Sequence, residues 1–276
     1  MLRVVFLLAL AALAQAQSLR VMTFNVRYPN PKDGADVWEN RRDLLVKTIR
    51  RHHPDVMGTQ ELFKLQGDFI VAALPEYAWF GVSRRGNEQD EHMGVFYRKT
   101  KLRLLESGNF WLSETPAVAG SSSWNMNLPR MVTWGLFEHI ASRRRFYYFN
   151  THFAHRGAQD EPARLHSAGV IKEHLAKLAQ PVLPVVLTGD FNAPATGAVH
   201  ARMLEAGLLD SRAVARRREG PEGTFHGFKG KPGAARIDWI LVSPRVKVKR
   251  NATLLDHTGE RFPSDHFPVL AELTLP

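Results

Sequence analysis

Five short apolar runs, each accompanied by hydrogen-bonding or ionisable side chains, constrain the fold of this chain more than any other feature. The runs occupy residues 21–23, 56–58, 146–149, 185–188 and 237–242. They are too short for helices and have the character of buried strands. The polar groups that accompany them are Thr23–Val26, Gln60–Glu61, Asn150–His152, Gly189–Asn192 and Ser264–His266. We therefore expect these groups to emerge together along one sheet edge.

The ionisable members of this set favour one kind of chemistry. Glu61, Asp190 and Asp265 supply carboxylates, amides and two histidines accompany them, and the chain contains 0 Cys. Hard oxygen ligands without thiolates suit Mg²⁺ or Mn²⁺ rather than a soft metal. The set predicts a site that uses a hard divalent cation to handle phosphate.

Six motifs occur in order along residues 19–276: FNVR, TQE, NTHF, GDFNA, RIDWI and PSDHFPV. In this order they resemble the endonuclease/exonuclease/phosphatase superfamily, the relatives of deoxyribonuclease I and exonuclease III. The resemblance implies an α/β fold, a four-layer α/β sandwich in which two mostly antiparallel sheets pack face to face with helices outside. Two segments, Trp38–Arg41 and Asp55–Glu61, resemble those of exported bacterial members of the superfamily near the deadenylase and nocturnin branch.

The resemblance makes Glu61 the principal metal ligand. Mg²⁺ usually takes one or two carboxylates together with water and substrate phosphate oxygens, and Asp265 would supply the second carboxylate. Asn25 would join the metal site or bind substrate, because an amide can orient a carboxylate or a phosphate oxygen without adding charge. For Glu61 alone, a glutamate that stabilises a helix start is the alternative.

The resemblance also implies catalytic roles for five residues. Asp190 would help to polarise the attacking water, and Asn192 would contact the phosphate or its metal. His266 would take the proton of the water or stabilise the pentacovalent phosphorus. Asp238 would pair with His266, which fixes the imidazole tautomer and raises its pKa. His152 would protonate the leaving oxygen or bind the phosphate.

Three further positions have a functional reading and an equal structural one. Arg130 precedes a predicted strand, where a substrate-binding cation would offset the negative charge that builds on phosphate oxygens. A surface arginine without a role is the alternative. Glu91–His92 would border the site or only solvate a turn. His155 matches no family position, and an exposed loop histidine explains it equally well.

The first residues have the features of a secretory signal peptide: a basic start, an apolar stretch over 4–13, and small residues at Ala14 and Ala16. We expect cleavage near Ala16, so that 1–16 are removed and 17–276 form one domain. The apolar stretch is shorter than the roughly 20 residues that span a bilayer, which disfavours the alternative of a membrane anchor. The predicted product is a periplasmic or secreted monomer without stable membrane insertion.

The chain carries a formal net charge of +10. Excess positive charge raises the local concentration of polyanions, so a phosphorylated substrate is favoured over a neutral one, and nucleic acid is one candidate partner. Two basic runs, Arg143–Arg145 and Arg216–Arg218, are predicted to lie in loops, the first at a hairpin tip.

The spacing of apolar residues between the motifs predicts the remaining elements. Helices are expected over 38–51, 162–178 and 199–206, the last closed by Gly207. Strands are expected over 77–82, 94–98, 102–111, 131–139 and 268–275.

These observations predict a secreted, Mg²⁺- or Mn²⁺-dependent phosphoesterase in which activated water attacks phosphorus without a covalent enzyme intermediate. The basic charge favours phosphodiester hydrolysis of nucleic acid. A phosphomonoesterase acting on a sugar, inositol or lipid phosphate is the first alternative, and an inactive binding protein on the same fold is the second. Substrate choice is expected to reside in loops, over residues 28–36, 84–91, 113–127 and 219–235.

Overall fold

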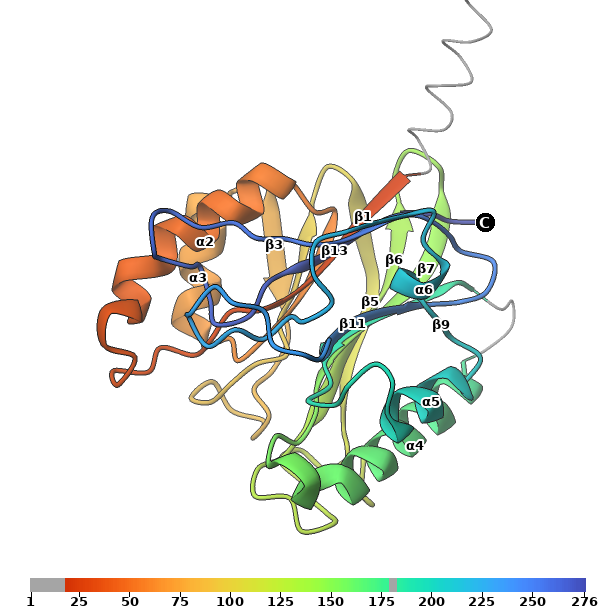
Figure 1. The fold of residues 1–276 in the computed structure, drawn as a ribbon. Coiled ribbons are helices and arrows are strands. Elements are labelled where there is room, and N and C mark those ends of the chain that lie inside the picture. Colours follow the sequence, from red (N-terminus) through yellow and green to blue (C-terminus); the bar gives the residue numbers. More distant parts are fainter. Residues whose placement is uncertain (1–17, 179–182) are drawn as a thin grey trace, which may run out of the picture.

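Two stacked β-sheets with helices on their outer faces form the framework of the protein (Figure 1). The computed structural model describes residues 18–178 and 183–276. The first sheet contains, in spatial order, β10 (Arg217–Glu219), β12 (Lys247–Thr253), β13 (Val269–Thr274), β1 (Ser18–Asn25), β2 (Val56–Gln60), β4 (Val95–Arg98) and β3 (Tyr77–Phe80). The second contains β5 (Leu102–Trp111), β6 (Met131–His139), β7 (Arg144–His152), β8 (Val185–Asp190), β11 (Asp238–Val242) and β9 (Leu209–Asp210).

Helices α2 (Trp38–His52) and α3 (Lys64–Ala73) cover the outer face of the first sheet. Helices α4 (Glu161–Ala176) and α5 (Ala198–Leu204) cover the outer face of the second. The shorter elements are η1 (Gly34–Asp36), η2 (Gly157–Asp160) and α6 (Ser211–Val214). Strand β1 is parallel to β2, β7 to β8 and β10 to β12, while the other neighbours are antiparallel. The predicted sandwich of two mostly antiparallel sheets is confirmed.

Three apolar layers hold the sandwich together. Val21 of β1 is buried between the sheets. Its neighbour Met22 turns the other way and belongs to the cluster that contains Ile49 of α2. On the far side, Leu187 of β8 belongs to the cluster that contains Ile171 of α4. Because side chains alternate between the faces of a strand, each sheet buries both faces, and each buried aliphatic side chain contributes about 1.5–3 kcal/mol.

A buried polar layer crosses between the sheets just below the site motifs. Nε2 of Gln60 donates to Oδ1 of Asn150 at 2.7 Å, and Nδ2 of Asn150 donates to the carbonyl oxygen of Thr59 at 2.7 Å. The sheets approach so closely that a Cβ at Gly58 would overlap Oδ1 of Asn150 and Oγ1 of Thr188. Gln60 and Asn150, two amides of the predicted polar set, therefore join the sheets.

The fold corrects two expectations. The polar motifs do not lie along one sheet edge, because Asn25 ends a strand of the first sheet and Glu61 follows another, whereas His152 and Asp190 end strands of the second. They meet at one end of the stacked pair instead. The two basic runs do not lie wholly in loops. Arg143 lies in the turn between β6 and β7, as predicted, but Arg144 and Arg145 begin β7. Arg217 and Arg218 belong to the edge strand β10, where charged side chains discourage pairing with another chain.

Most of the predicted elements are present. The helix expected over 38–51 is α2, and the strands expected over 102–111 and 131–139 are β5 and β6. The predicted signal peptide, residues 1–16, lies outside the described residues. Within the described ranges, no helix combines the length and the apolar character that crossing a membrane requires.

Candidate active site

Strand pairing gathers residues from distant parts of the sequence at one end of the sandwich. In the second sheet, Asp190 is the register partner of His152 on β7 and of Asp238 on β11. In the first sheet, Asn25 ends β1 and Glu61 directly follows β2, which runs parallel to β1. The two sheets therefore contribute side chains to one shared space.

Asp190 is at the centre of this group. Its Oδ2 atom lies 3.5 Å from Nε2 of His152 and 3.8 Å from Nε2 of His266. The same oxygen accepts a hydrogen bond from Nδ2 of Asn25 at 3.1 Å. Burial, and after it the charge of Asp238, raises the pKa of Asp190 to about 7. A carboxyl group in this position can orient a water molecule and accept its proton.

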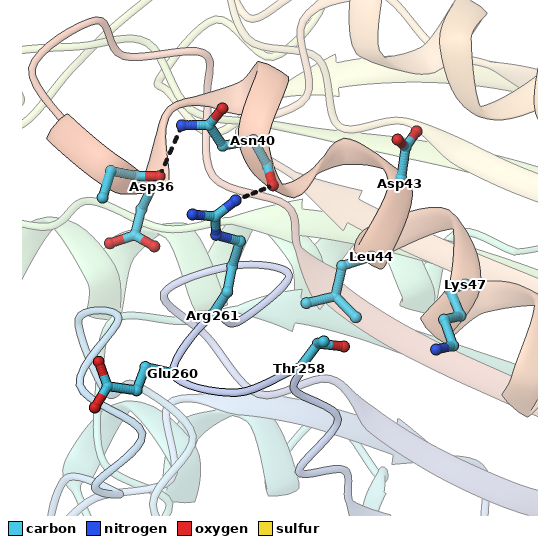
Figure 2. Close-up of a pocket in the computed structure, with 9 residues that line it drawn as sticks. Asp36, Asn40, Asp43, Leu44, Lys47, Thr258, Glu260 and Arg261 are labelled. Carbon is cyan, nitrogen blue, oxygen red and sulfur yellow. Dashed lines mark hydrogen bonds between the residues drawn. The ribbon is translucent and has the colours of Figure 1, made fainter.

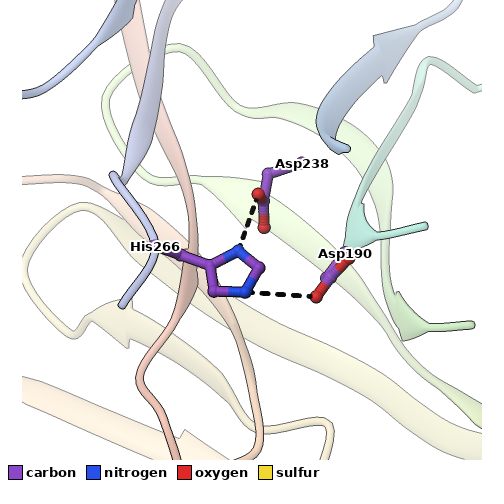
Figure 3. A group of neighbouring side chains, drawn as sticks. All are labelled: Asp190, Asp238 and His266. Carbon is purple, nitrogen blue, oxygen red and sulfur yellow. Dashed lines mark hydrogen bonds and ion pairs between the residues drawn. The ribbon is translucent and has the colours of Figure 1, made fainter. Parts of the chain in front are cut away.

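His266 is held by Asp238 (Figure 3). Nδ1 of His266 lies 2.9 Å from Oδ2 of Asp238, and both side chains are buried. Burial alone would lower the pKa of His266, but the carboxylates of Asp238 and Asp190 outweigh it and raise this pKa well above its ordinary value. Ligand atoms of these three residues lie within 4.8 Å of one another, so the group could also hold a metal ion.

Glu61 and Asp265, the predicted metal ligands, face the same guanidinium. Nη1 of Arg27 lies 3.7 Å from Oε2 of Glu61, and Nε of Arg27 lies 3.9 Å from Oδ2 of Asp265. Glu61 also accepts hydrogen bonds from Nδ2 of Asn25 at 3.0 Å and from the backbone N–H of Tyr28 at 3.3 Å. Arg27 was not predicted to belong to the site, although its position two residues after Asn25 could have indicated it.

The two amides of the site bind protein groups. Oδ1 of Asn25 accepts a hydrogen bond from the backbone N–H of Arg27 at 3.0 Å. Its Nδ2 donates to the carboxylates of Glu61 and Asp190 and so orients them. The place of Asn25 among the metal ligands stays a prediction. Asn192, with φ 48°, donates its backbone N–H to Asp190 at 2.9 Å and its Nδ2 to the carbonyl oxygen of Phe153 at 3.1 Å. Its side chain still lines the cavity.

A wall of N–H donors, formed by Arg84, Arg130 and His155, faces these carboxylates, and we call it the donor wall. Arg130 is only 2% exposed, and its Nη2 lies 2.9 Å from Nδ1 of His155. Among the residues that the structure describes, Nε and Nη1 of Arg130 have no hydrogen-bond partner, and neither has Nε of Arg84. Burial, and after it the charge of Arg130, lowers the pKa of His155.

Glu91 joins the donor wall to His152. Oε2 of Glu91 lies 2.8 Å from Nη1 of Arg84 and 3.9 Å from Nδ1 of His152. Burial, and after it the charge of Glu61, raises the pKa of Glu91 to about 7. Burial, and after it the charge of Arg130, lowers the pKa of His152 well below its ordinary value. Of the pair Glu91–His92, Glu91 lines the cavity and His92 does not, while the other two open positions, Arg130 and His155, both line it.

All these groups surround one cavity of about 780 Å³. The predicted residues that line it are Glu61, Arg130, His152, Asp190, Asn192, Asp265 and His266. Asn25 and Asp238 lie behind this surface and are hydrogen-bonded to it. The lining residues without a role predicted from the sequence include Arg27, Tyr28, Phe63, Arg84, Phe225 and Phe228. Arg84, Phe225 and Phe228 lie in loops that were predicted to determine substrate choice.

A second cavity of about 640 Å³ lies apart from this site (Figure 2). Its charged lining residues are Asp36, Asp43, Lys47, Glu260 and Arg261. Nη1 of Arg261 donates to the carbonyl oxygen of Asn40 at 3.0 Å, which ties the segment before β13 to α2. This cavity contains none of the histidines and paired carboxylates described above, so it is not the candidate active site.

Known proteins resemble this chain over most of its length. The sequence profile of the Endonuclease/Exonuclease/phosphatase family matches residues 22–266. A mannosyl-6-phosphatase from Bacteroides thetaiotaomicron is 38% identical, with a TM-score of 0.87 over 93% of this chain and 99% of that one. The catalytic domain of human nocturnin has the same fold, with 19% identity and a TM-score of 0.75 over 94% of this chain and 95% of that one.

Curated relatives match a smaller part of the chain. The 2′,5′-phosphodiesterase 12 of mouse is 26% identical over 63% of this chain, and the chain spans 32% of that protein. It spans 59% of a second relative, an uncharacterised mimivirus protein. The profile match and the full-length structural likeness agree with the geometry of the site. The chain belongs to the Endonuclease/Exonuclease/phosphatase family, whose members are phosphoric ester hydrolases.

Proposed function

We propose that this protein is a divalent-metal-dependent phosphomonoesterase that transfers the phosphate of a small sugar phosphate to water. One observation carries the proposal. Arg130 lines the cavity that holds Glu61, Asp190 and Asp265, and two nitrogens of its buried guanidinium, Nε and Nη1, have no acceptor among the described residues.

A buried cation without an ionic partner is costly, by several kcal/mol before compensation. Within residues 18–178 and 183–276, the side chain of Arg130 has one hydrogen bond, to His155. Arg84 adds another unpartnered nitrogen to the same wall. The terminal oxygens of a phosphate monoester would accept from these N–H groups in charge-assisted hydrogen bonds, which are stronger than neutral ones.

The carboxylates of Glu61 and Asp265 fit a divalent cation. One oxygen of each lies within 4 Å of the guanidinium of Arg27, so the two negative charges lie close to the same point. Carboxylate oxygens suit Mg²⁺ or Mn²⁺, and Asn25 is the predicted third contact. When bound there, the ion would supply positive charge to the phosphate oxygens.

Water would attack phosphorus directly. Oδ2 of Asp190 orients the water and takes its proton, with Nε2 of His266 nearby at 3.8 Å. Asp238 holds the His266 imidazole through Nδ1, which leaves Nε2 turned to the reacting groups. As the bond between the water oxygen and phosphorus forms, the ester bond between phosphorus and the sugar oxygen breaks.

The remaining site residues serve the phosphate and the leaving group. His152, whose Nε2 lies 3.5 Å from Asp190, is neutral because its pKa is lowered, and it donates a hydrogen bond to a phosphate oxygen. The leaving sugar oxygen takes its proton from His266, whose raised pKa keeps the imidazole charged. Asn192 contacts a phosphate oxygen. Arg130 and Arg84 offset the negative charge that grows on the equatorial oxygens.

The distribution of charge favours a small substrate over a polymer. Arg143 and Arg145 pair with Glu138 near the start of β7, and His152 ends the same strand. Nine residues of strand separate the two ends by about 25 Å. The charges of β10 lie on the edge of the other sheet. The similarity to a mannosyl-6-phosphatase supports a sugar phosphate.

A phosphodiester of nucleic acid is the second candidate substrate. Phe225 is 45% exposed at the cavity, and its ring centroid lies 5.0 Å from that of His266. An exposed ring in this place could stack a base. The net charge of +10 and the similarity to a 2′,5′-phosphodiesterase also favour this candidate.

The proposed enzyme acts outside the cytoplasm as a monomer. The basic start, apolar stretch and small residues before Gln17 support removal of residues 1–16 by a signal peptidase. N-terminal sequencing of the exported protein would test this, since a protein that still begins at Met1 would contradict it. Light scattering of the purified protein would test the monomer.

Hydrolysis of p-nitrophenyl phosphate and bis-p-nitrophenyl phosphate, each with Mg²⁺, Mn²⁺ or EDTA, tests the reaction class. We expect faster turnover of the monoester and loss of turnover in EDTA. Faster turnover of the diester would replace the first candidate by the second. A folded protein that hydrolyses neither compound, nor mannose 6-phosphate, would favour the inactive binding protein.

A further inference from the structure

Arg27 and Asp33 form a tight ion pair beside the proposed metal site. Nε and Nη2 of Arg27 donate to the two carboxylate oxygens of Asp33 at 3.0 and 2.8 Å. Nδ2 of Asn30 also donates to Asp33, at 3.0 Å, and the Arg27 guanidinium carbon lies 4.5 Å from the ring centroid of Tyr28. The guanidinium is thus fixed in position by several contacts.

The same guanidinium faces the two proposed metal ligands. It lies 3.7 Å from a carboxylate oxygen of Glu61 and 3.9 Å from one of Asp265. These distances are too long for good hydrogen bonds, but at such separations two charges still interact by about 1 kcal/mol in water and more in a protein. Asp33 takes the hydrogen-bonding edge of Arg27 and so keeps it from binding Glu61 or Asp265 directly.

We propose that the Arg27–Asp33 pair sets the affinity of the site for its divalent cation. The positive charge of Arg27 repels a divalent cation bound by Glu61 and Asp265. Asp33 weakens this repulsion, because it neutralises Arg27 and keeps the guanidinium hydrogen-bonded away from the two metal ligands. Arg27 is therefore a positioning residue of the metal site. The inference rests on the metal site of the proposed function.

The two partners are expected to have opposite effects on metal binding. Calorimetric titration of the purified protein with Mn²⁺ gives the dissociation constant without any measurement of activity. R27Q removes the competing charge, so we expect Mn²⁺ to bind roughly tenfold more tightly. D33N removes a nearby negative charge and frees Arg27 to bind Glu61 or Asp265, so we expect binding to weaken roughly tenfold.

A double variant shows whether Asp33 acts through Arg27. In the R27Q background, the weakening by D33N should shrink to about threefold or less, because the freed competitor is gone. R156Q is the matched control, since Arg156 forms a similar two-point pair with Asp160 and is absent from the cavity lining. The control should bind Mn²⁺ like the wild type.

The outcomes separate this inference from the proposed function. Equal dissociation constants for wild type, R27Q and D33N, with E61Q impaired, would overturn the role of the pair and leave the metal site intact. A wild-type protein that binds no Mn²⁺, or binds it with the same affinity as E61Q, would overturn both the role of the pair and the metal site of the proposed function. Thermal unfolding checks that each variant is folded. If R27Q does not fold, R27K replaces it. Lysine keeps the positive charge but cannot make the two-point contact with Asp33, so R27K should bind Mn²⁺ more weakly than the wild type.

Discussion

Nδ1 of His266 lies 2.9 Å from Oδ2 of Asp238, although Asp238 begins a strand of the second sheet and His266 precedes a strand of the first. The pair therefore forms only when the two sheets are stacked. The stacking of the two sheets therefore sets the geometry of the proposed reaction.

Asp238→Asn should lower kcat by a factor of about 10²–10⁴, because the neutral amide no longer holds the charged imidazole of His266 or supports its raised pKa. KM should change little. Nitrogen NMR should show a lower pKa of His266 in the variant, which a merely structural loss would not produce. Asp55→Asn is the control, since Asp55 is a buried carboxylate that binds Arg98 away from the site, at 3.1 Å. Wild-type kcat in Asp238→Asn would contradict the role of the pair.

Arg130→Met should weaken inhibition by inorganic phosphate at least roughly tenfold, because the donor wall loses its buried cation. The same change should raise the free energy of unfolding of the ligand-free protein by about 1 kcal/mol, since it removes a buried charge whose interactions with Glu91, Asp190 and Glu61 do not offset its burial. Phosphate inhibition constants and urea unfolding measure the two effects.

Arg103→Gln is the control for Arg130→Met. Arg103 is exposed and pairs with Glu138 at 3.4 Å in the part of β5 remote from the site. Neither phosphate inhibition nor stability should change measurably in this variant. An unchanged inhibition constant in Arg130→Met would contradict the binding of phosphate by Arg130, on which the proposed function rests.

Gly58→Ala should destabilise the protein by about 2 kcal/mol or more, because a Cβ there overlaps Asn150 and Thr188 in the polar layer between the sheets. Gly169→Ala is the matched control. Gly169 lies inside α4, and nothing lies within 4 Å of the Cβ that alanine would add. This second change should stabilise the protein by about 0.5–1 kcal/mol. Urea unfolding compares the two variants, and equal effects would show that the sheets are not packed as described.

Asp210→Asn should destabilise the protein by about 3 kcal/mol at pH 7. Burial alone would raise the pKa of Asp210, but hydrogen bonds from His200 and Arg236 outweigh it and hold this pKa well below the ordinary 3.8. A carboxyl group with a depressed folded-state pKa adds stability above its unfolded pKa and loses it as the pH falls. The difference between variant and wild type should therefore shrink below about pH 4.

The control for this pH dependence is Glu205→Gln, because Glu205 is exposed and pairs with Arg202 on the surface at 2.8 Å. Its effect on the free energy of unfolding should stay below about 0.5 kcal/mol at both pH values. Urea unfolding at pH 7 and pH 3 measures both variants. A difference for Asp210→Asn that does not depend on pH would contradict the assigned pKa.

The sequence predicts the elements whose apolar spacing is long and regular. The 38–51 spacing predicts α2, and the apolar content of 102–111 predicts β5. Strand β12 was missed, although Lys247, Val248 and Lys249 alternate with the period of a strand. Strand β10 has no such signal, because its three residues are charged and lie at a sheet edge.

The sequence also predicts the site residues that belong to motifs at strand ends. The structure brings Asp190, Asp238 and His266 together as predicted. The pairing of Arg27 with Asp33, and the unpartnered nitrogens of Arg130, could not be predicted. The pairing depends on the course of the loop that follows β1, and the unpartnered nitrogens depend on which side chains the stacked sheets bury. No pattern in the sequence encodes either.

Release of inorganic phosphate from mannose 6-phosphate, by wild type and by Glu61→Gln, tests the central claim most directly. The purified protein would be treated with EDTA and then supplied with Mg²⁺ or Mn²⁺. We predict turnover by the wild type only after metal is restored, and a loss of at least about 100-fold in kcat/KM for Glu61→Gln. Equal turnover by wild type and Glu61→Gln, or turnover that persists in EDTA, would contradict the claim.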